Sequence, residues 1–260
     1  MDTVLTTAAL VLGAVVGSFL NVVILRLPAE GESIVFPASR CPFCGTPIRW
    51  YDNIPILSYL LLRGRCRACG QSISLQYPLV ELCMALLSLA LYTKFALSFE
   101  FFFYFLFLAS LLVIIFIDLR HQIIPDVISL PGIAAGFAGA FFTSQLTWQE
   151  SGIGILAGGG LLYGVAMGYL LLTGREGMGG GDVKLLAMIG AFLGWQSLLF
   201  VVFASSLAGS IVGIFAMLKQ GKGGRTRIPY GPFLALAAIL FLFFQHDIFR
   251  LWQSYLTLGS

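Results

Sequence analysis

The chain has 260 residues, of which 58% are hydrophobic and 14% aromatic, and only 10% are charged. Apolar runs near 20 residues long recur along its whole length, which excludes an ordinary soluble domain and indicates a polytopic membrane protein. The net charge of +3 is explained by the excess of Lys and Arg that the cytoplasmic loops of membrane proteins carry. It is therefore no argument for a nucleic-acid partner.

The first apolar run, residues 4–25, predicts a membrane helix that is not cleaved off as a signal peptide. No basic region precedes it and no small-residue cleavage site follows it before Arg26, so it differs from a signal peptide. The one polar stretch long enough to fold outside the bilayer comes next. We therefore predict a first transmembrane helix over residues 1–26, a cytosolic insert over residues 27–78, and a transmembrane bundle over residues 79–260.

The insert carries two Cys-x-x-Cys pairs, which are separated by 21 residues. This spacing is typical of four-cysteine zinc sites, because a tight turn presents two thiolates to one ion. Two disulfides or four idle thiols are the alternatives, but a cytosolic compartment keeps thiols reduced. Four thiolates leave no open coordination position, so the metal is structural, with zinc preferred over iron. The predicted ligands are Cys41, Cys44, Cys66 and Cys69.

The remaining apolar runs predict seven more helices, which makes an all-α polytopic fold of about eight transmembrane helices. The uncharged run between Leu185 and Leu218 would extend about 50 Å as one helix, beyond the roughly 30 Å hydrocarbon core, so we expect a break at Gly194-Trp195-Gln196. One of the two resulting helices must be short. The eight predicted helices cover residues 4–25, 79–97, 100–118, 124–142, 152–173, 183–198, 199–218 and 229–247.

The distribution of Lys and Arg predicts the orientation of these helices. An even number of helices places both termini on one side of the membrane. If that side is the periplasm, 13 of the 15 Lys and Arg residues face the cytoplasm, and Lys94 and Arg250 are the exceptions. The insert and the inner ends of the third and sixth helices then face the cytoplasm.

Two aspartates lie at those inner helix ends. Charged side chains beside hydrocarbon are costly and usually mark chemistry or transport. Asp118 by itself could be present without a catalytic role, because it could pair with Arg120 or stay solvated. Asp182 follows Gly179-Gly180-Gly181, which leave room for a substrate backbone, and the dipole of its helix should favour the ionised carboxylate. If they meet, the two carboxyls form a pair able to share a proton and activate water.

Several other polar and small residues have structural explanations. Gly160, Gly164 and Gly168 recur every four residues, a spacing that lets helices pack closely in lipid. Asn21 and Glu81 either line a further binding site or satisfy backbone groups at helix ends. Lys184 either steadies the Asp182 region or anchors its helix at the interface.

The chain resembles the type IV prepilin peptidases, a GxGD-type family of membrane aspartic proteases that also act as N-methyltransferases. The resemblance rests on motifs that follow one another along nearly the whole chain: Gly17-Ser-Phe-Leu-Asn21, Arg40-Cys-Pro-Phe-Cys44, Asn53-Ile-Pro55, Gly64-Arg-Cys66, Tyr77-Pro-Leu-Val-Glu81, Ile124-Pro125-Asp126, Gly179-Gly-Gly-Asp182-Val-Lys184 and Ile228-Pro-Tyr-Gly-Pro232.

The resemblance implies an enzyme of the bacterial inner membrane. Such an enzyme cuts a short basic leader from prepilins or pseudopilins, whose next segment is a hydrophobic helix, on the cytoplasmic side. It then methylates the new N-terminus with S-adenosylmethionine. Carried over by residue, Asp118 and Asp182 would be the catalytic pair, while the position of the methyl-donor site stays unknown. A proton- or ion-coupled transporter and a zinc-stabilised assembly subunit are the competing functions; no repeat of two related halves supports the transporter.

Overall fold

The computed structural model describes residues 2–29, 31, 33–174, 179–220 and 229–258. Within these ranges the regular structure is helical, and β pairing is limited to two isolated bridges in the insert. The all-α fold expected from the sequence is therefore confirmed. The helices form two compact units, Met1–Ile117 and Asp118–Ser260. Four cations that were used to orient the chain lie outside the described residues: Arg175, Lys222, Arg225 and Arg227.

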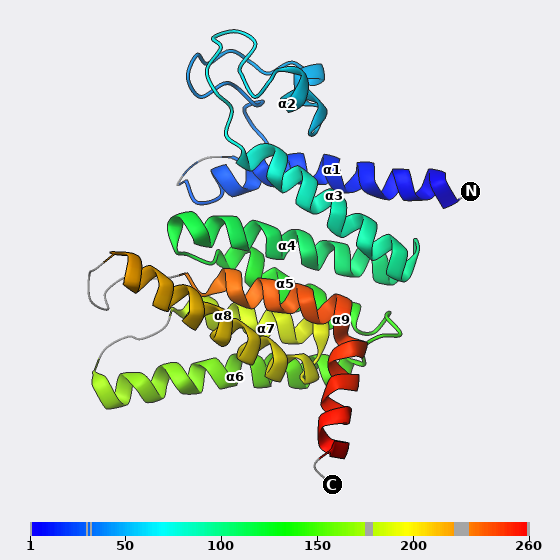
Figure 1. Ribbon diagram of the computed structural model, residues 1–260, viewed down its shortest axis with the longest axis vertical. Helices are drawn as coiled ribbons and strands as arrows, with labels where there is room; N and C mark the ends of the chain where they lie inside the picture. The colour runs from blue at the N-terminus through cyan, green and yellow to red at the C-terminus, as the bar shows by residue number, and fades with distance from the viewer. Residues whose placement is uncertain (1, 30, 32, 175–178, 221–228, 259–260) are drawn as a thin grey trace. The chain divides into compact units, whose positions relative to one another are not determined.

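Each of the eight predicted apolar runs forms a helix (Figure 1). In the described part of the chain, six helices are long and apolar enough to cross a membrane. They are α1 (Asp2–Arg26), α3 (Gln76–Phe95), α4 (Phe99–His121), α6 (Trp148–Thr173), α8 (Gln196–Gln220) and α9 (Gly231–Leu258).

The other two apolar helices, α5 (Asp126–Gly139) and α7 (Gly180–Leu193), have 14 residues each. At 1.5 Å per residue they extend about 21 Å, which is less than the hydrocarbon thickness. The expected break in the long apolar run is present, because α7 ends at Leu193 and α8 begins at Gln196. The short helix expected there is α7.

In the first unit, α1 and α3 pack with their backbones close together. A Cβ atom placed on Gly13 would lie 2.6 Å from the carbonyl oxygen of Met84, and one on Gly17 would lie 2.8 Å from the Cα of Glu81. Only glycine permits such an approach, as at small-residue interfaces between membrane helices. The hydroxyl of Ser88 adds a hydrogen bond of 2.6 Å to the carbonyl oxygen of Ala9.

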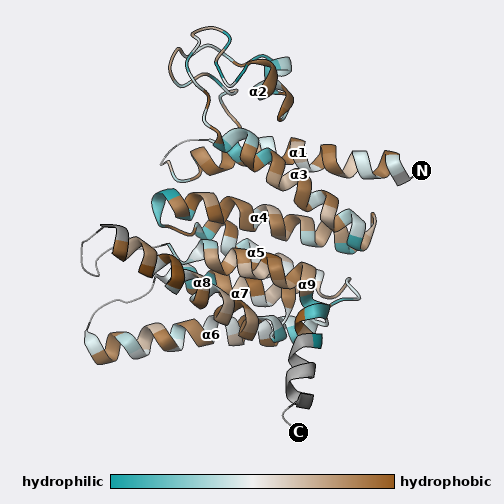
Figure 2. Cartoon of the chain, viewed as in Figure 1, coloured by the Kyte–Doolittle hydropathy of each residue, from teal (hydrophilic) through white to brown (hydrophobic). Residues whose placement is uncertain are grey.

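The insert lies between α1 and α3 along the chain. It contains a 3-10 helix, η1 (Trp50–Asn53), and the five-residue helix α2 (Leu57–Leu61), and its other described residues form loops. Hydrophilic and hydrophobic residues alternate along these loops, whereas the long helices are predominantly hydrophobic (Figure 2). The insert is therefore too poor in regular structure and apolar core to be held by packing alone, which fits the prediction that a metal holds it.

In the second unit, α7 is the central helix. Every residue from Leu185 to Leu193 is buried, and α7 contacts α5, α6, α8 and α9. A Cβ atom on Gly154 of α6 would lie 2.2 Å from the carbonyl oxygen of Gly190, so α6 and α7 also meet backbone to backbone. A helix that is apolar on all sides is expected at such a buried position.

Helix α6 packs closely against α7 through glycines other than the three that the sequence predicts. A Cβ atom built on Gly160, Gly164 or Gly168 meets no atom of the described part of the chain within 4 Å. The expected packing seam at these three residues is therefore wrong within this chain. The glycines that do pack, Gly154 and Gly158, have the same spacing of four but lie nearer the start of α6, where α7 runs beside it.

Candidate active site and candidate metal centre

Asp118 lies in the last turn of α4 and is only 4% exposed. Its Oδ2 atom accepts a hydrogen bond of 3.0 Å from the backbone N–H of Gly231, at the start of α9. The first N–H groups of a helix have no partner within the helix, so α9 has a free donor to offer. A Cβ atom on Gly231 would lie 2.6 Å from the same oxygen. The contact therefore requires glycine at position 231.

Asp182 lies in the first turn of α7, two residues after the helix begins and outside the six candidate membrane spans. The helix dipole was expected to favour its ionised form. Burial, followed by the negative charge of Asp118, instead raises the pKa of Asp182 to about 6. The loss of hydration and the negative charge of Asp118 both act in the direction opposite to the one expected from the dipole.

Ile124 lies where the segments carrying these two aspartates meet. A Cβ atom on Gly181, beside Asp182, would lie 2.9 Å from the Cβ of Ile124, and one on Gly231 would lie 3.1 Å from its Cδ1. The end of α4, the start of α7 and the start of α9 thus converge on one side chain. All of these residues belong to the second unit. Two carboxyls that interact in such a water-poor place tend to retain one proton between them.

Lys184 pairs with a third carboxylate in this region. Its Nζ atom lies 2.7 Å from both oxygens of Asp126, the first residue of α5. This ion pair joins the start of α7 to the start of α5. The residue before α5 is Pro125, whose ring fixes its φ and whose backbone is extended. Sequence reasoning assigned no role to Asp126 or Gly231, although both occur in the motifs on which the resemblance rests.

The four predicted metal ligands are brought together in the insert. The Sγ atoms of Cys41, Cys44, Cys66 and Cys69 all lie within 4.8 Å of one another, and those of Cys41 and Cys69 are 3.9 Å apart. Four sulfurs bound tetrahedrally to zinc at about 2.3 Å would be separated by roughly 3.8 Å. The cluster is therefore close to the required geometry, and its thiolates are the soft donors that zinc accepts.

The two cysteine loops have nearly the same backbone structure. In the first, the N–H of Gly45 donates to the carbonyl oxygen of Cys41 at 2.9 Å; in the second, the N–H of Gly70 donates to that of Cys66 at 2.9 Å. Both glycines have positive φ, 70° and 72°, which a residue with a side chain rarely adopts. Each Cys-x-x-Cys-Gly segment therefore folds into the same tight turn and presents its two sulfurs to one point.

Asn21 and Glu81 satisfy backbone groups, which favours the second of the two explanations given for them. Glu81 Oε2 accepts a hydrogen bond of 2.7 Å from the N–H of Ile56, and the Asn21 amide donates to the carbonyl oxygen of Tyr77 at 3.1 Å. Both side chains are buried. They connect α1, α3 and the insert within the first unit.

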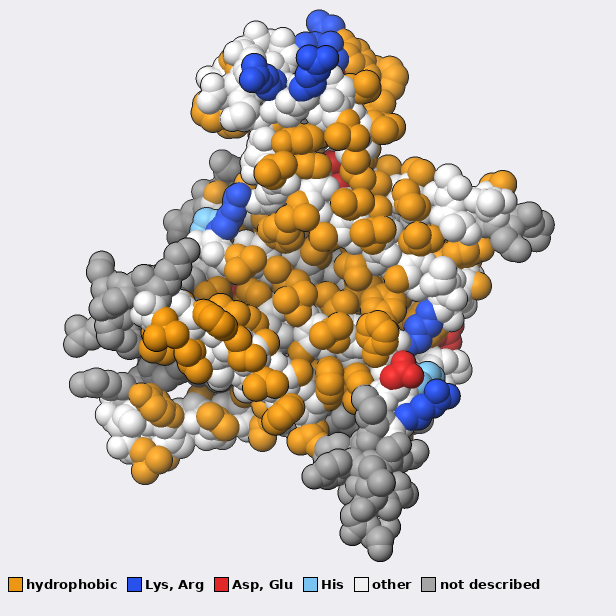
Figure 3. Space-filling model, in the orientation of Figure 1, with side chains coloured by type: hydrophobic (Ala, Val, Ile, Leu, Met, Phe, Trp, Pro, Cys, Tyr) orange, Lys and Arg blue, Asp and Glu red, His pale blue; other side chains and the backbone are white. Residues whose placement is uncertain are grey.

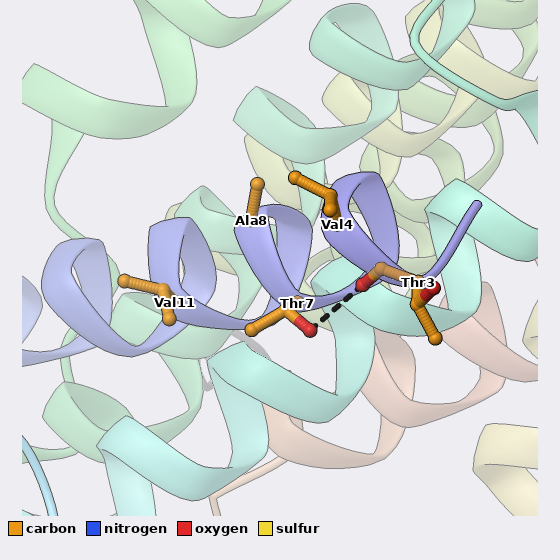
Figure 4. Close-up of a pocket in the computed structure, with 5 residues that line it drawn as sticks. All are labelled: Thr3, Val4, Thr7, Ala8 and Val11. Carbon is orange, nitrogen blue, oxygen red and sulfur yellow. Dashed lines mark hydrogen bonds between the residues drawn. The ribbon is translucent and has the colours of Figure 1, made fainter. Parts of the chain in front are cut away.

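A shallow groove is present elsewhere, on α1 (Figure 4). It is lined by Thr3, Val4, Thr7, Ala8 and Val11, and the Thr7 hydroxyl donates to the carbonyl oxygen of Thr3 at 2.8 Å. None of these side chains titrates or binds metal, so the groove offers no chemistry. The aspartate cluster remains the candidate active site.

Two family models match successive parts of the chain. The model for the bacterial peptidase A24 N-terminal domain matches residues 11–95, which include the four cysteines, and the model for the type IV leader peptidase family matches residues 105–214, which include Asp118 and Asp182. A prepilin leader peptidase/N-methyltransferase of Pseudomonas putida is 39% identical over 94% of this chain and 92% of its own length. The chain belongs to the type IV leader peptidase family.

Two further family members bear the same name. The one from Myxococcus xanthus is 45% identical over 82% of this chain and 64% of its own length. The one from Pseudomonas aeruginosa is 37% identical over 95% of this chain and 92% of its own length. No solved structure matches the chain. The resemblance inferred from the motifs is confirmed, and the transporter alternative is not favoured. A type IV leader peptidase with six candidate spans is a multi-pass protein of the inner membrane.

Proposed function

We propose that this type IV leader peptidase removes the short basic leader from prepilins or pseudopilins, with Asp118 and Asp182 as its catalytic pair. The observation that carries the proposal is that the segments carrying the buried Asp118 and the half-buried Asp182 meet at Ile124, with the charge of Asp118 raising the pKa of Asp182. Two carboxyls that share one proton form the arrangement used for aspartic proteolysis.

In the proposed reaction the ionised carboxylate takes a proton from water, and the water oxygen attacks the carbonyl carbon of the scissile peptide bond. The protonated carboxyl donates its proton to the carbonyl oxygen. The C–N bond then breaks as a proton passes to the leaving nitrogen, so one water molecule supplies the new carboxyl oxygen and the new amine hydrogen. The N–H of Gly231 holds Asp118 in orientation throughout.

Substrate access is proposed to run over the glycines that precede Asp182. Among the described residues, a built Cβ atom on Gly180 meets nothing within 4 Å, and one on Gly179 approaches Asp182 Oδ2 only to 3.9 Å. An extended peptide backbone therefore has room beside the carboxylate. The substrates would combine a basic leader with a hydrophobic N-terminal helix, which keeps the cleavage point near the membrane surface.

The proposed orientation places both termini in the periplasm and the aspartates at the cytoplasmic surface, as the positions of 13 of the 15 Lys and Arg residues require. The division into a first helix over residues 1–26, a cytosolic insert over residues 27–78 and a catalytic bundle over residues 79–260 is part of the same proposal. Lipid is its natural environment, and no nucleic-acid partner is proposed.

Zinc is the proposed occupant of the cysteine cluster, held by Cys41, Cys44, Cys66 and Cys69 as a structural ion. It would supply the folding energy that this small insert lacks. A second activity follows the cleavage in this proposal. In it the freed α-amino group, as the neutral amine, would attack the methyl carbon of S-adenosylmethionine, so that the methyl–sulfur bond breaks, S-adenosylhomocysteine leaves and the methylated nitrogen loses a proton.

The test is cleavage of a purified leader-bearing prepilin by the full-length protein in liposomes. Asp118→Asn and Asp182→Asn each keep the shape of the side chain but remove the carboxylate, and each should lower cleavage by at least about 10³-fold. Asp247→Asn, at an exposed carboxylate of α9, is the matched control and should cleave normally. Cleavage by both active-site variants at the wild-type rate would refute the mechanism. Radiolabelled S-adenosylmethionine in the same reaction measures methyl transfer separately.

A further inference from the structure

The short helix α2 exposes large apolar side chains. Leu57 is 58% exposed, Leu60 65% and Leu61 81%, while Ser58 on the same helix is buried. Trp50, in the adjoining η1, is 81% exposed. Contiguous exposed apolar surface of this kind marks an interaction site. The nature of the partner can be inferred from how α2 is attached.

A buried contact attaches α2 directly to a membrane helix. Ile56, which caps the start of α2, donates its N–H to Glu81 Oε2 at 2.7 Å. Ile56 has a φ of 62°, which is unfavourable for a β-branched residue, so this contact holds a conformation that the backbone would otherwise avoid. The buried Glu81 therefore sets where α2 begins relative to α3.

The position of Glu81 along α3 gives the depth of that attachment. The candidate membrane span of α3 begins at Gln76, so Glu81 lies five residues into that span, about 7.5 Å at 1.5 Å per residue. Interfacial helices lie with their apolar face about 5–10 Å into the boundary between headgroups and acyl chains. The start of α2 is thus held at the depth of that boundary.

The orientation of the insert agrees with this depth. In Figure 1, α2 lies on the side of the insert toward which α1 runs back to the N-terminus, and in Figure 3 hydrophobic side chains gather on that same side. Because α1 crosses the membrane, this side of the insert points into the bilayer. Lys and Arg side chains gather at the top of the insert in the same view (Figure 3).

The charge of the insert favours an anionic lipid surface over a basic peptide. Arg49, Arg63 and Arg65 are exposed around η1 and α2. Arginines of this kind attract the anionic headgroups of the cytoplasmic leaflet and would repel the basic leader of the proposed substrate. An exposed tryptophan such as Trp50 is also typical of the membrane interface.

We propose that α2 is an interfacial helix, which inserts Leu57, Leu60 and Leu61 into the headgroup–acyl boundary of the cytoplasmic leaflet at a depth set by Glu81. The insert then has two supports. Its cysteine cluster holds the loops together, and α2 fixes the insert against the membrane surface.

The experiment uses the full-length protein in vesicles of phosphatidylcholine and phosphatidylglycerol. An environment-sensitive fluorescent amino acid is incorporated at position 61 by amber suppression, which leaves the cysteines untouched. The same residue at position 68, an exposed site of the second cysteine loop, is the matched control. Lipids brominated on their acyl chains should quench the probe at position 61 several-fold more than the probe at position 68.

Variants of Glu81 test whether this residue sets the depth. Glu81→Leu removes the acceptor for the Ile56 N–H and should reduce quenching at position 61 toward the level at position 68. Glu81→Gln keeps an acceptor oxygen and should preserve quenching. Equal quenching at positions 61 and 68 in the wild type would overturn the proposal. It would also be overturned if the probe at position 61 became shielded only after a leader-bearing peptide was added, because the peptide would then be the partner.

Discussion

Gly231→Ala tests the candidate active site without changing any ionisable group. The added methyl carbon would lie 2.6 Å from Asp118 Oδ2 and 3.1 Å from Ile124 Cδ1, well inside ordinary contact distances. The carboxylate must then move away, and its hydrogen bond to the N–H of residue 231, 3.0 Å long in the wild type, is lengthened or broken.

The size of the effect follows from that bond. A hydrogen bond to a charged group contributes about 1.5–3 kcal/mol. At 1.4 kcal/mol per tenfold change this corresponds to a loss of roughly 10- to 100-fold in kcat. Displacing a catalytic group by about 1 Å has a similar effect. Gly231 begins α9 without a positive φ, so alanine fits its backbone and the fold should be retained.

The assay compares kcat for cleavage of a prepilin in liposomes with thermal unfolding of the same preparation. Gly160→Ala is the control, because a Cβ atom built there meets no described atom within 4 Å and the residue lies outside the proposed site, so kcat should stay within about threefold of the wild type. If Gly231→Ala cleaves as fast as Gly160→Ala while both stay folded, the N–H of residue 231 does not orient Asp118.

Three further perturbations have definite expected outcomes. The pKa of Asp182 is raised to about 6 from its ordinary 3.8, so the stability that its protonated form contributes is present at low pH and is lost as the pH rises through 6. The Asp182→Asn variant should therefore unfold a few degrees higher than the wild type at pH 8. Thermal unfolding scans should show this difference in unfolding temperature shrinking toward pH 4. Cys41→Ser should lower bound zinc from about one equivalent per chain toward zero by metal mass spectrometry and make the insert sensitive to protease; a full equivalent of zinc in the variant would refute the ligand set. Gly154→Ala places a methyl carbon 2.2 Å from the carbonyl oxygen of Gly190 and should cost about 1–3 kcal/mol of stability, whereas Gly160→Ala, in open space, should be neutral or slightly stabilising in the same unfolding assay.

The sequence was sufficient to predict the helices because hydrophobic runs and their breaks are local signals. The end of α7 at Leu193 and the start of α8 at Gln196 follow from the length of the hydrocarbon core and one glycine. The cysteine cluster was equally accessible, since a tight turn with a glycine after each pair brings the sulfurs together within a few residues. In both cases the deciding interaction lies close along the chain.

Contacts between distant segments were much harder to predict. A spacing of four identifies glycines able to pack, but Gly160 and Gly154 have the same spacing pattern, and only the path of α7 decides which of them meets a neighbour. The pairing of Lys184 with Asp126 could not be derived for the same reason. The donor to Asp118 is a backbone N–H, which every residue except proline carries, so no residue type reveals it.

The hydrogen bond between Asp118 and Gly231 also has a consequence for biogenesis. Its two partners are separated by 113 positions, and the donor belongs to α9, which leaves the ribosome after both α4 and α7. A nascent chain that has inserted α4 and α7 already carries Asp118 and Asp182, but Asp118 still lacks the N–H of Gly231 that donates to it. With the proposed roles of the two aspartates, the catalytic pair is complete only once the start of α9 has reached Asp118.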